Sequence, residues 1–231
     1  MTYLSVKALI CLELLREPEA ELDSLASRLG LTKRVVEAKC CELRDTGLVD
    51  LQGPRVRALD KLSLALEAVS EGVSPETVAR HLNWRDFERL CSKAFEMNEF
   101  TCTTGLRFKR LGRLREVDVL AARKPVLVAV DCKSWGIRRG KLSMLRRAIE
   151  QHLDRVGSLA AVLPELKAKL GLAEWSYAVL VPAIVTLFEE SLYVHRGVPV
   201  VPVFKLNNFI QELPSYLDEL ATWRVKLSFL D

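Results

Sequence analysis

The segment "EVDVLAARKPVLVAVDCKSW", residues 116–135, constrains the fold of this chain more than any other stretch. Apolar and polar residues alternate in two short Val-rich runs on either side of Arg123-Lys124-Pro125, and an alternation of period two predicts β-strands. If the runs pair as a hairpin, one face is apolar and is made of Val117, Val119, Val126, Val128, Val130 and Cys132. The opposite face then carries Glu116, Asp118, Asp131 and Lys133.

Two registers of this hairpin bring carboxylates together. In one register Asp118 lies directly opposite Asp131, with the Cβ atoms about 4.5–5.5 Å apart. After a slip of two residues Glu116 faces Asp131, and Asp118 lies on the diagonal. Like charges that face each other across a strand pair destabilise it, so a compensating cation is expected.

A hard divalent cation is the expected compensation, because Mg²⁺ (or Mn²⁺) prefers carboxylate oxygens and can also bind substrate phosphates. Such an ion lowers the pKa of a bound water and stabilises the charge that grows on a phosphodiester under attack. Lys133 follows Asp131 by two residues, so it is placed to act on that water or to neutralise the developing charge. The pattern predicts a metal site for phosphate chemistry.

The composition indicates an ordinary globular protein. Of 231 residues, 49% are hydrophobic and 28% charged, which excludes a disordered chain. The longest apolar run, "YAVLVPAIVTLF", is too short for the roughly 20 residues that span a bilayer, so we expect a cytoplasmic protein without a membrane partner. The six cysteines form no C-x-x-C pair, so neither a zinc site nor a redox motif is indicated.

Positive charge is concentrated around the acidic cluster. Residues 105–147 contain 13 Lys and Arg but only three acids, which are Glu116, Asp118 and Asp131. A basic surface around carboxylates suits a polyanion held by its phosphates, and a solvated basic face is the alternative. The candidate nucleic-acid contacts in this region are Arg107, Lys109, Arg110, Arg113, Arg138, Arg139 and Lys141.

The first 60 residues predict three helices and a small hairpin, which together resemble a winged helix-turn-helix. Helix-spaced apolar residues end before Pro18, at Gly30 and at Gly47, and two short strands flank Gly53. The resemblance implies that the helix over 32–46 enters the major groove of DNA, with Lys33 and Arg34 among its contacts. Because residues 1–60 carry a net charge of −1, dimerisation or protein contact remains the alternative.

Residues 61–82 are expected to form a helical linker, with Ser74 as a helix N-cap and Pro75 at the first helical position. The second domain, residues 83–231, alternates helices and strands, which predicts an α/β fold with a mixed central sheet flanked by helices. Its first helix, in "NWRDFERLCSKAFEMNEF", places Glu88 within an apolar stripe between Trp84 and Phe95. A carboxylate on a buried face needs a partner or a metal.

Asp118, a 12-residue spacer and then Asp131-Cys132-Lys133 match the pattern D…(D/E)-x-K of the PD-(D/E)XK nuclease superfamily, and the chain resembles that superfamily over residues 83–213. The segment "WRDFERLCSKAFEMNEF" is similar to the helix that precedes the catalytic hairpin in the restriction-enzyme-like and archaeal Holliday junction resolvase branches. The resemblance implies a restriction-endonuclease-like fold. It also implies that Glu88 is the glutamate that completes the active site in those branches. Gln151 occurs on the later helix, with Arg155 where some branches carry a Tyr.

The sequence and the resemblance together predict a Mg²⁺-dependent DNA endonuclease, in which a winged helix positions the enzyme on DNA or mediates a homodimer. Catalysis would depend on Glu88, Asp118, Asp131 and Lys133, and the metal would be held by Asp118, Asp131, the Cys132 carbonyl and Glu88. Two alternatives stay open. One is a DNA-binding regulator whose nuclease-like domain is only a scaffold, and the other is an RNA-processing enzyme with the same chemistry.

Overall fold

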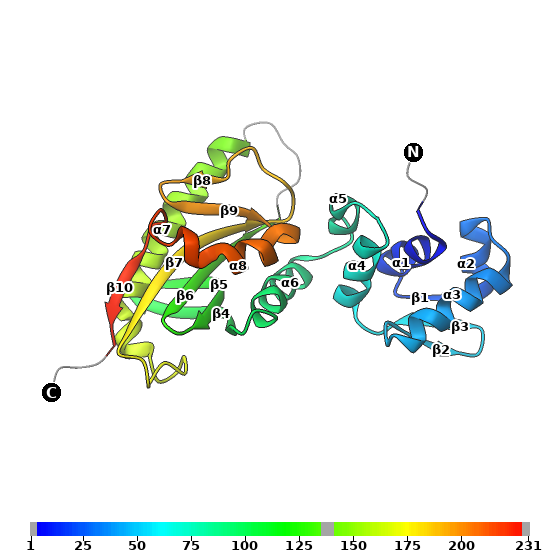
Figure 1. The fold of residues 1–231 in the computed structure, drawn as a ribbon, viewed down its shortest axis with the longest axis horizontal. Coiled ribbons are helices and arrows are strands. Elements are labelled where there is room, and N and C mark those ends of the chain that lie inside the picture. The colour runs from blue at the N-terminus through cyan, green and yellow to red at the C-terminus, as the bar shows by residue number, and fades with distance from the viewer. Residues whose placement is uncertain (1–3, 135–140, 228–231) are drawn as a thin grey trace. The chain divides into compact units, whose positions relative to one another are not determined.

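The computed structural model describes residues 4–134 and 141–227 (Figure 1). The chain divides into two compact units, Met1–Asp86 and Phe87–Asp231, hereafter the N-terminal and C-terminal units. Each unit buries its own apolar side chains, such as Ile10, Leu25 and Leu43 in the first and Val119 and Val130 in the second. Residues 61–82, expected as a linker, fall within the N-terminal unit.

The N-terminal unit contains five helices and a three-stranded sheet among its described residues. The helices are α1 (Val6–Arg16), α2 (Leu22–Leu29), α3 (Lys33–Asp45), α4 (Lys61–Ser70) and α5 (Pro75–Ala79). The strands are β1 (Glu19–Glu21), β2 (Val49–Gln52) and β3 (Arg55–Ala58), in the order β1-β3-β2. The three predicted helices and the hairpin are confirmed. The three-residue β1 was not predicted, because it pairs with β3 at a distance in sequence that local alternation does not detect.

Local signals explain where these helices begin and end. The Ser5 side chain accepts a hydrogen bond from the Ala8 amide at the start of α1. Gly30 ends α2 in the left-handed conformation, with φ of 66°. Ser74 caps α5 and Pro75 occupies its first turn, as predicted. Helix α4 packs on α1, where Lys7 forms ion pairs with Glu67 and Glu71.

The C-terminal unit is built around a seven-stranded mixed sheet. Its described helices are α6 (Trp84–Glu96), whose first turn contains the boundary between the units, α7 (Lys141–Leu166), α8 (Leu206–Tyr216) and a short 3-10 turn (Val203–Lys205). Its strands are β4 (Thr101–Arg110), β5 (Arg113–Arg123), β6 (Val126–Lys133), β7 (Tyr177–Thr186), β8 (Val194–His195), β9 (Val198–Pro202) and β10 (Trp223–Lys226).

The strand order is β4-β5-β6-β7-β9-β8, and β10 pairs with one end of β7. Strands β4, β5 and β6 are antiparallel because tight turns connect them, whereas β6, β7 and β9 are parallel. Parallel neighbours need a long crossover, and α7 supplies the one between β6 and β7.

Helices cover both faces of this sheet (Figure 1). Val156, Leu159 and Leu163 of α7 pack on Leu120 and Ala129 of the sheet. The opposite face contacts α6, where the Cys91 and Cys132 sulfurs are 3.6 Å apart, and α6 is joined to α8 by a hydrogen bond from Asn98 to Asn207. The predicted α/β class with a mixed, helix-flanked sheet is therefore confirmed. Across residues 4–134 and 141–227, no helix is both long and apolar enough to cross a membrane.

Candidate active site

The end of the β5–β6 ladder brings Asp118 and Asp131 together. The ladder runs from Arg123 opposite Val126 to Val119 opposite Val130, so the next pair in this register is Asp118 with Asp131. This is the first of the two predicted registers, and the slip that would place Glu116 opposite Asp131 does not occur. Asp118 does not continue the ladder, because its Oδ2 accepts the Cys132 amide hydrogen at 2.7 Å.

The strand alternation changes phase at this point. Gly105, which would face Asp118 across β4, has φ of 58°, a left-handed conformation that glycine adopts readily. Beyond it, Leu106, Phe108 and Val117 join the apolar cluster under α7, together with Leu120 and Ala129. The prediction that Val117 shares the Cys132 face is therefore wrong. Local distortions of this kind re-aim side chains, and they are common beside active sites.

Asp131 is buried between two cations. It is 2% exposed, its Oδ2 lies 2.6 Å from Lys133 Nζ, and its Oδ1 accepts a hydrogen bond from Arg155 Nη1 at 2.6 Å. Oδ2 is enclosed and makes no hydrogen bond of regular geometry within the described part of the chain, so Lys133 contacts it as a charge. The sequence missed Arg155 as a partner, because only the packing of α7 on the sheet brings it to Asp131.

The pKa values of the two carboxylates are shifted in opposite directions. Burial and the neighbouring Asp131 charge raise the pKa of Asp118 to about 6, although the Cys132 amide and Lys133 oppose the shift. Burial alone would also raise the pKa of Asp131, but nearby positive charges bring it below the ordinary value. A pair of acids with separated pKa values is typical of functional sites.

His152 on α7 lies under this pair and is fully buried. Its Nε2 is 2.9 Å from the Ala129 carbonyl oxygen, and burial lowers its pKa to about 4. The imidazole is therefore neutral at neutral pH. It follows that Lys133 and Arg155 supply the positive charge that keeps Asp131 ionised there.

Cys132 presents its backbone, not its thiol, to the site. Burial and the contact with Cys91 raise the pKa of the thiol well above its ordinary value, so the sulfur is a packing group. The N–H and C=O groups of one strand residue point to the same neighbouring strand. Since the Cys132 amide binds Asp118, the Cys132 carbonyl is also directed toward β5.

Glu88 and Glu116 take different positions. Glu88 is half-buried on α6, and its carboxylate makes a small contribution to the raised pKa of Asp118. Trp84, expected beside it on a buried stripe, is 40% exposed. Glu116 accepts a hydrogen bond from Arg107 Nε at 2.7 Å. Of these two acids, Glu88 is the one whose charge the structure connects to the site.

These groups fit a hard divalent cation. Asp118 and Asp131 offer carboxylate oxygens, the Cys132 carbonyl is directed to the same side, and Asp131 Oδ2 is enclosed with Lys133 Nζ as its contact at 2.6 Å. In the described ranges no three His, Cys, Asp or Glu side chains gather as a metal-binding group. Mg²⁺ is a cation that proteins often bind with only one or two carboxylates, the rest of its shell being water and substrate oxygen.

The predicted nucleic-acid contacts fall into separate environments. Lys33 is exposed on α3 and pairs with Asp23 at 2.7 Å, while Arg34 is exposed beside it. Arg107 binds Glu116, Lys109 is exposed, and Arg110 and Arg113 lie at the turn between β4 and β5. Arg138 and Arg139 lie outside the described residues, and for Lys141 only the backbone at the start of α7 is described.

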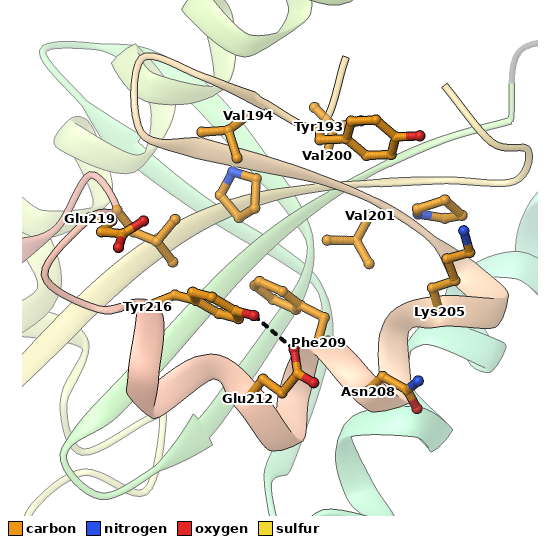
Figure 2. A pocket seen from close by; sticks show the side chains of 13 residues that line it. Tyr193, Val194, Val200, Val201, Lys205, Asn208, Phe209, Glu212, Tyr216 and Glu219 are labelled. Atoms are coloured by element: carbon orange, nitrogen blue, oxygen red, sulfur yellow. Dashed lines mark hydrogen bonds between the residues drawn. The ribbon is translucent and has the colours of Figure 1, made fainter. Parts of the chain in front are cut away.

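A cavity lies between β9 and α8 (Figure 2). It has a volume of about 620 Å³ and an aromatic, largely apolar lining that includes Tyr193, Phe209 and Tyr216. The Tyr216 hydroxyl donates a hydrogen bond to Glu212 at 2.9 Å, which raises the pKa of the phenol. Its size suits a small ligand. Its acids and its lysine do not converge on one point as Asp118, Asp131 and Lys133 do (Figure 2).

Comparisons with known proteins add little to this picture. No protein-family model matches the chain. An uncharacterized protein of Archaeoglobus fulgidus is 28% identical over 140 residues, which cover 61% of this chain and 98% of that protein. Among solved structures, protein VC1899 from Vibrio cholerae aligns with a TM-score of 0.35 and 10% identity, over 94% of this chain and 58% of that one. This chain thus corresponds to little more than half of VC1899.

Proposed function

We propose that this protein is a Mg²⁺-dependent nuclease that hydrolyses phosphodiester bonds in DNA. The proposal includes a restriction-endonuclease-like core in the C-terminal unit and membership of the PD-(D/E)XK superfamily. The observation that carries it is the open end of the β5–β6 ladder, where Asp118, Asp131 and Lys133 converge in the predicted register. The raised pKa of Asp118 adds support, because strongly shifted pKa values are concentrated at functional sites.

In this proposal the chain's own groups divide the labour. Asp118 and Asp131 would hold Mg²⁺ with the Cys132 carbonyl, and Glu88 would assist directly or through water. When bound, the ion would stabilise the charge of the phosphodiester and lower the pKa of a water molecule. Lys133, an ammonium in contact with Asp131, is placed to stabilise negative charge on the attacked phosphate. Mn²⁺ is expected to replace Mg²⁺, since both suit oxygen ligands.

For the N-terminal unit we propose a winged helix that serves dimerisation or protein contact more than DNA contact. The order of its helices and strands supports the winged helix. Its basic side chains are largely neutralised by acids of the same unit, as in the pairs Lys33–Asp23, Lys39–Glu42 and Arg44–Asp45. Such local pairs leave little net positive charge for phosphates. A homodimer would supply two active sites for two strands.

One observation favours a second candidate, a DNA-binding regulator with an inactive core. Lys133 and Arg155 already balance the charge of Asp131 without any metal. A site in that state could serve only to hold β6 and α7 together. Loss of a metal ligand would be expected in a decayed site, and the presence of Asp118, Asp131 and Lys133 weighs for the nuclease.

A cleavage assay tests the proposal. Wild type and the variants Asp118→Ala and Lys133→Ala are incubated with linear duplex, single-stranded, flap and four-way-junction DNA, and with RNA, in Mg²⁺, Mn²⁺ or EDTA. We expect metal-dependent cutting of DNA by wild type alone. Cutting by either purified variant at the wild-type rate would contradict the proposal, and binding of DNA without cutting would favour the regulator.

A further inference from the structure

The turn between β4 and β5 forms a basic groove with α7, next to the acidic site. Two adjoining cavities of about 480 Å³ and about 290 Å³ share Arg113, Arg115 and Asp154 as lining residues. The larger also reaches Arg110, and the smaller also reaches Gln151 and Arg155. The groove thus contains four arginines and one aspartate.

The groove leads directly to the acidic site. Arg155 lines the smaller cavity, and its Nη1 is the donor that binds Asp131. Arg115 binds Asp154 at 2.6 Å, and Arg110 Nη1 donates a hydrogen bond to the Gly157 carbonyl at 3.1 Å, so contacts with α7 fix two of the arginines. Arg113 is exposed and has no ion-pair partner within residues 4–134 and 141–227. Counting Asp154 and Asp131 against the four arginines leaves a net charge of +2 along the groove.

The same hairpin carries basic residues that do not face the groove. Arg107 is occupied by Glu116, and Lys109 is exposed but lines neither cavity. At the tip, Leu111 is 92% exposed with a positive φ of 49°. Proteins that enter nucleic-acid grooves combine arginines with exposed apolar side chains in this way.

We propose that this groove binds the sugar–phosphate backbone of the strand that the acidic site cuts. The main contact is the exposed Arg113, and the guanidinium nitrogens of Arg110, Arg115 and Arg155 that do not bond Gly157, Asp154 or Asp131 assist it. This inference rests on the proposed function and deepens it. It separates the basic hairpin into a binding side and a side that faces solvent, and it adds Arg115 and Arg155 to the nucleic-acid contacts. Phosphate oxygens are the acceptors that planar guanidinium groups bind best.

The test compares Arg113→Ala with Lys109→Ala, a change of the same charge on the same hairpin. Binding to labelled duplex DNA, single-stranded DNA and duplex RNA is measured by fluorescence anisotropy in EDTA, over 50–200 mM KCl. Each phosphate contact contributes a slope of about 0.9 on duplex DNA, so Arg113→Ala should lower the slope by roughly one and weaken binding roughly eightfold at 0.1 M salt. Lys109→Ala should change neither quantity.

Equal effects of the two variants, or no effect of either, would contradict phosphate binding in the groove. Cleavage is measured separately in Mg²⁺ with the same proteins. If wild type cuts DNA but Arg113→Ala binds DNA like wild type, phosphate binding in the groove is contradicted and the proposed nuclease activity is supported. If Arg113→Ala alone weakens salt-dependent binding and wild type cuts no substrate, phosphate binding in the groove is supported and the proposed nuclease activity is contradicted.

Discussion

The ionisation of Asp118 opposes folding. Its pKa in the folded chain is about 6, against 3.8 ordinarily, so the folded state binds more protons between these values and the free energy of unfolding falls as pH rises from about 4 to 6. The full shift corresponds to about 3 kcal/mol, which partial solvent access reduces to about 1–2 kcal/mol. A neutral side chain at residue 118 should therefore stabilise the metal-free protein above pH 6.

We expect Asp118→Asn to raise the free energy of unfolding by about 1–2 kcal/mol at pH 8 in EDTA, and by less at pH 5, because Asn can still accept the Cys132 amide hydrogen. Urea unfolding at the two pH values measures the difference. Glu116→Gln is the control, since Glu116 is exposed. A loss of stability at pH 8 would mean that the Asp118 charge is compensated in the folded protein.

His152 should produce the opposite pH dependence. Its pKa is lowered to about 4, so the folded state binds fewer protons than the unfolded state, and stability is lost as pH falls from about 6.5 toward 4. We expect His152→Leu to cost about 1 kcal/mol at pH 8, where Ala129 loses its hydrogen-bond partner, and to cost less at pH 5. An equal cost at both pH values, by urea unfolding, would contradict a buried neutral imidazole.

At the scale of residues, the sequence predicted that Asp131 meets a carboxylate of the neighbouring strand, because strand alternation and a tight turn bring Asp118 or Glu116 near it. The sequence did not choose between the two registers, of which the structure has the one that leads to Asp118. It did not predict Arg155 as a partner of Asp131. That contact joins residues 24 positions apart on a helix and a strand, and it depends on how α7 packs on the sheet.

At the scale of elements, Gly105 controls the direction of the β4–β5 hairpin. A Cβ at Gly105 would lie 3.9 Å from Glu116 Oε1, so there is room for it, but φ of 58° disfavours any L side chain. We expect Gly105→Ala to destabilise the protein by about 1 kcal/mol and to weaken nucleic-acid binding as well, because the strands beyond it would lose their phase.

Gly171→Ala is the matched control for this prediction. Gly171 has φ of 70°, and a Cβ there would meet nothing within 4 Å, so the backbone cost should be similar and binding should be unchanged. Urea unfolding and anisotropy measure the two effects. If both variants bind DNA like wild type, the hairpin direction does not depend on Gly105.

Helix α3 is expected to contribute less to DNA binding than the β4–β5 hairpin does. Because Lys33 of α3 is paired with Asp23, we expect Lys33→Ala to weaken DNA binding less than threefold and to leave the salt slope nearly unchanged. Anisotropy with the full chain is the measurement. A loss as large as that of Arg113→Ala would show that α3 lies on DNA.

Elements with local signals were predictable, and elements defined by distant pairing were not. Helix α5 follows from Ser74 and Pro75, which act within one turn. Strand β1 depends on β3, and the phase change at Gly105 depends on α7 beneath Leu106 and Phe108, so neither can be read from alternation within one strand.

At the scale of the whole molecule, the division into two compact units allows the stability of the C-terminal unit to be followed separately. Metal bound only by the folded C-terminal unit stabilises that unit by mass action. Trp175 and Trp223 pack against its core cluster, so their fluorescence reports its unfolding. At Mg²⁺ tenfold above the dissociation constant the gain is about 1.4 kcal/mol, or roughly 3–6 °C for a unit of this size.

We therefore expect Mg²⁺ to raise the melting temperature seen by tryptophan fluorescence in wild type but not in Asp118→Asn, which lacks one of the proposed charged ligands. K⁺ at matched ionic strength is the control, since general screening acts on both proteins alike. An equal shift in both proteins would locate the effect away from Asp118. A shift confined to wild type, together with metal-dependent cutting, would separate the nuclease from the regulator, because a scaffold in which Lys133 and Arg155 already balance Asp131 needs no metal ion.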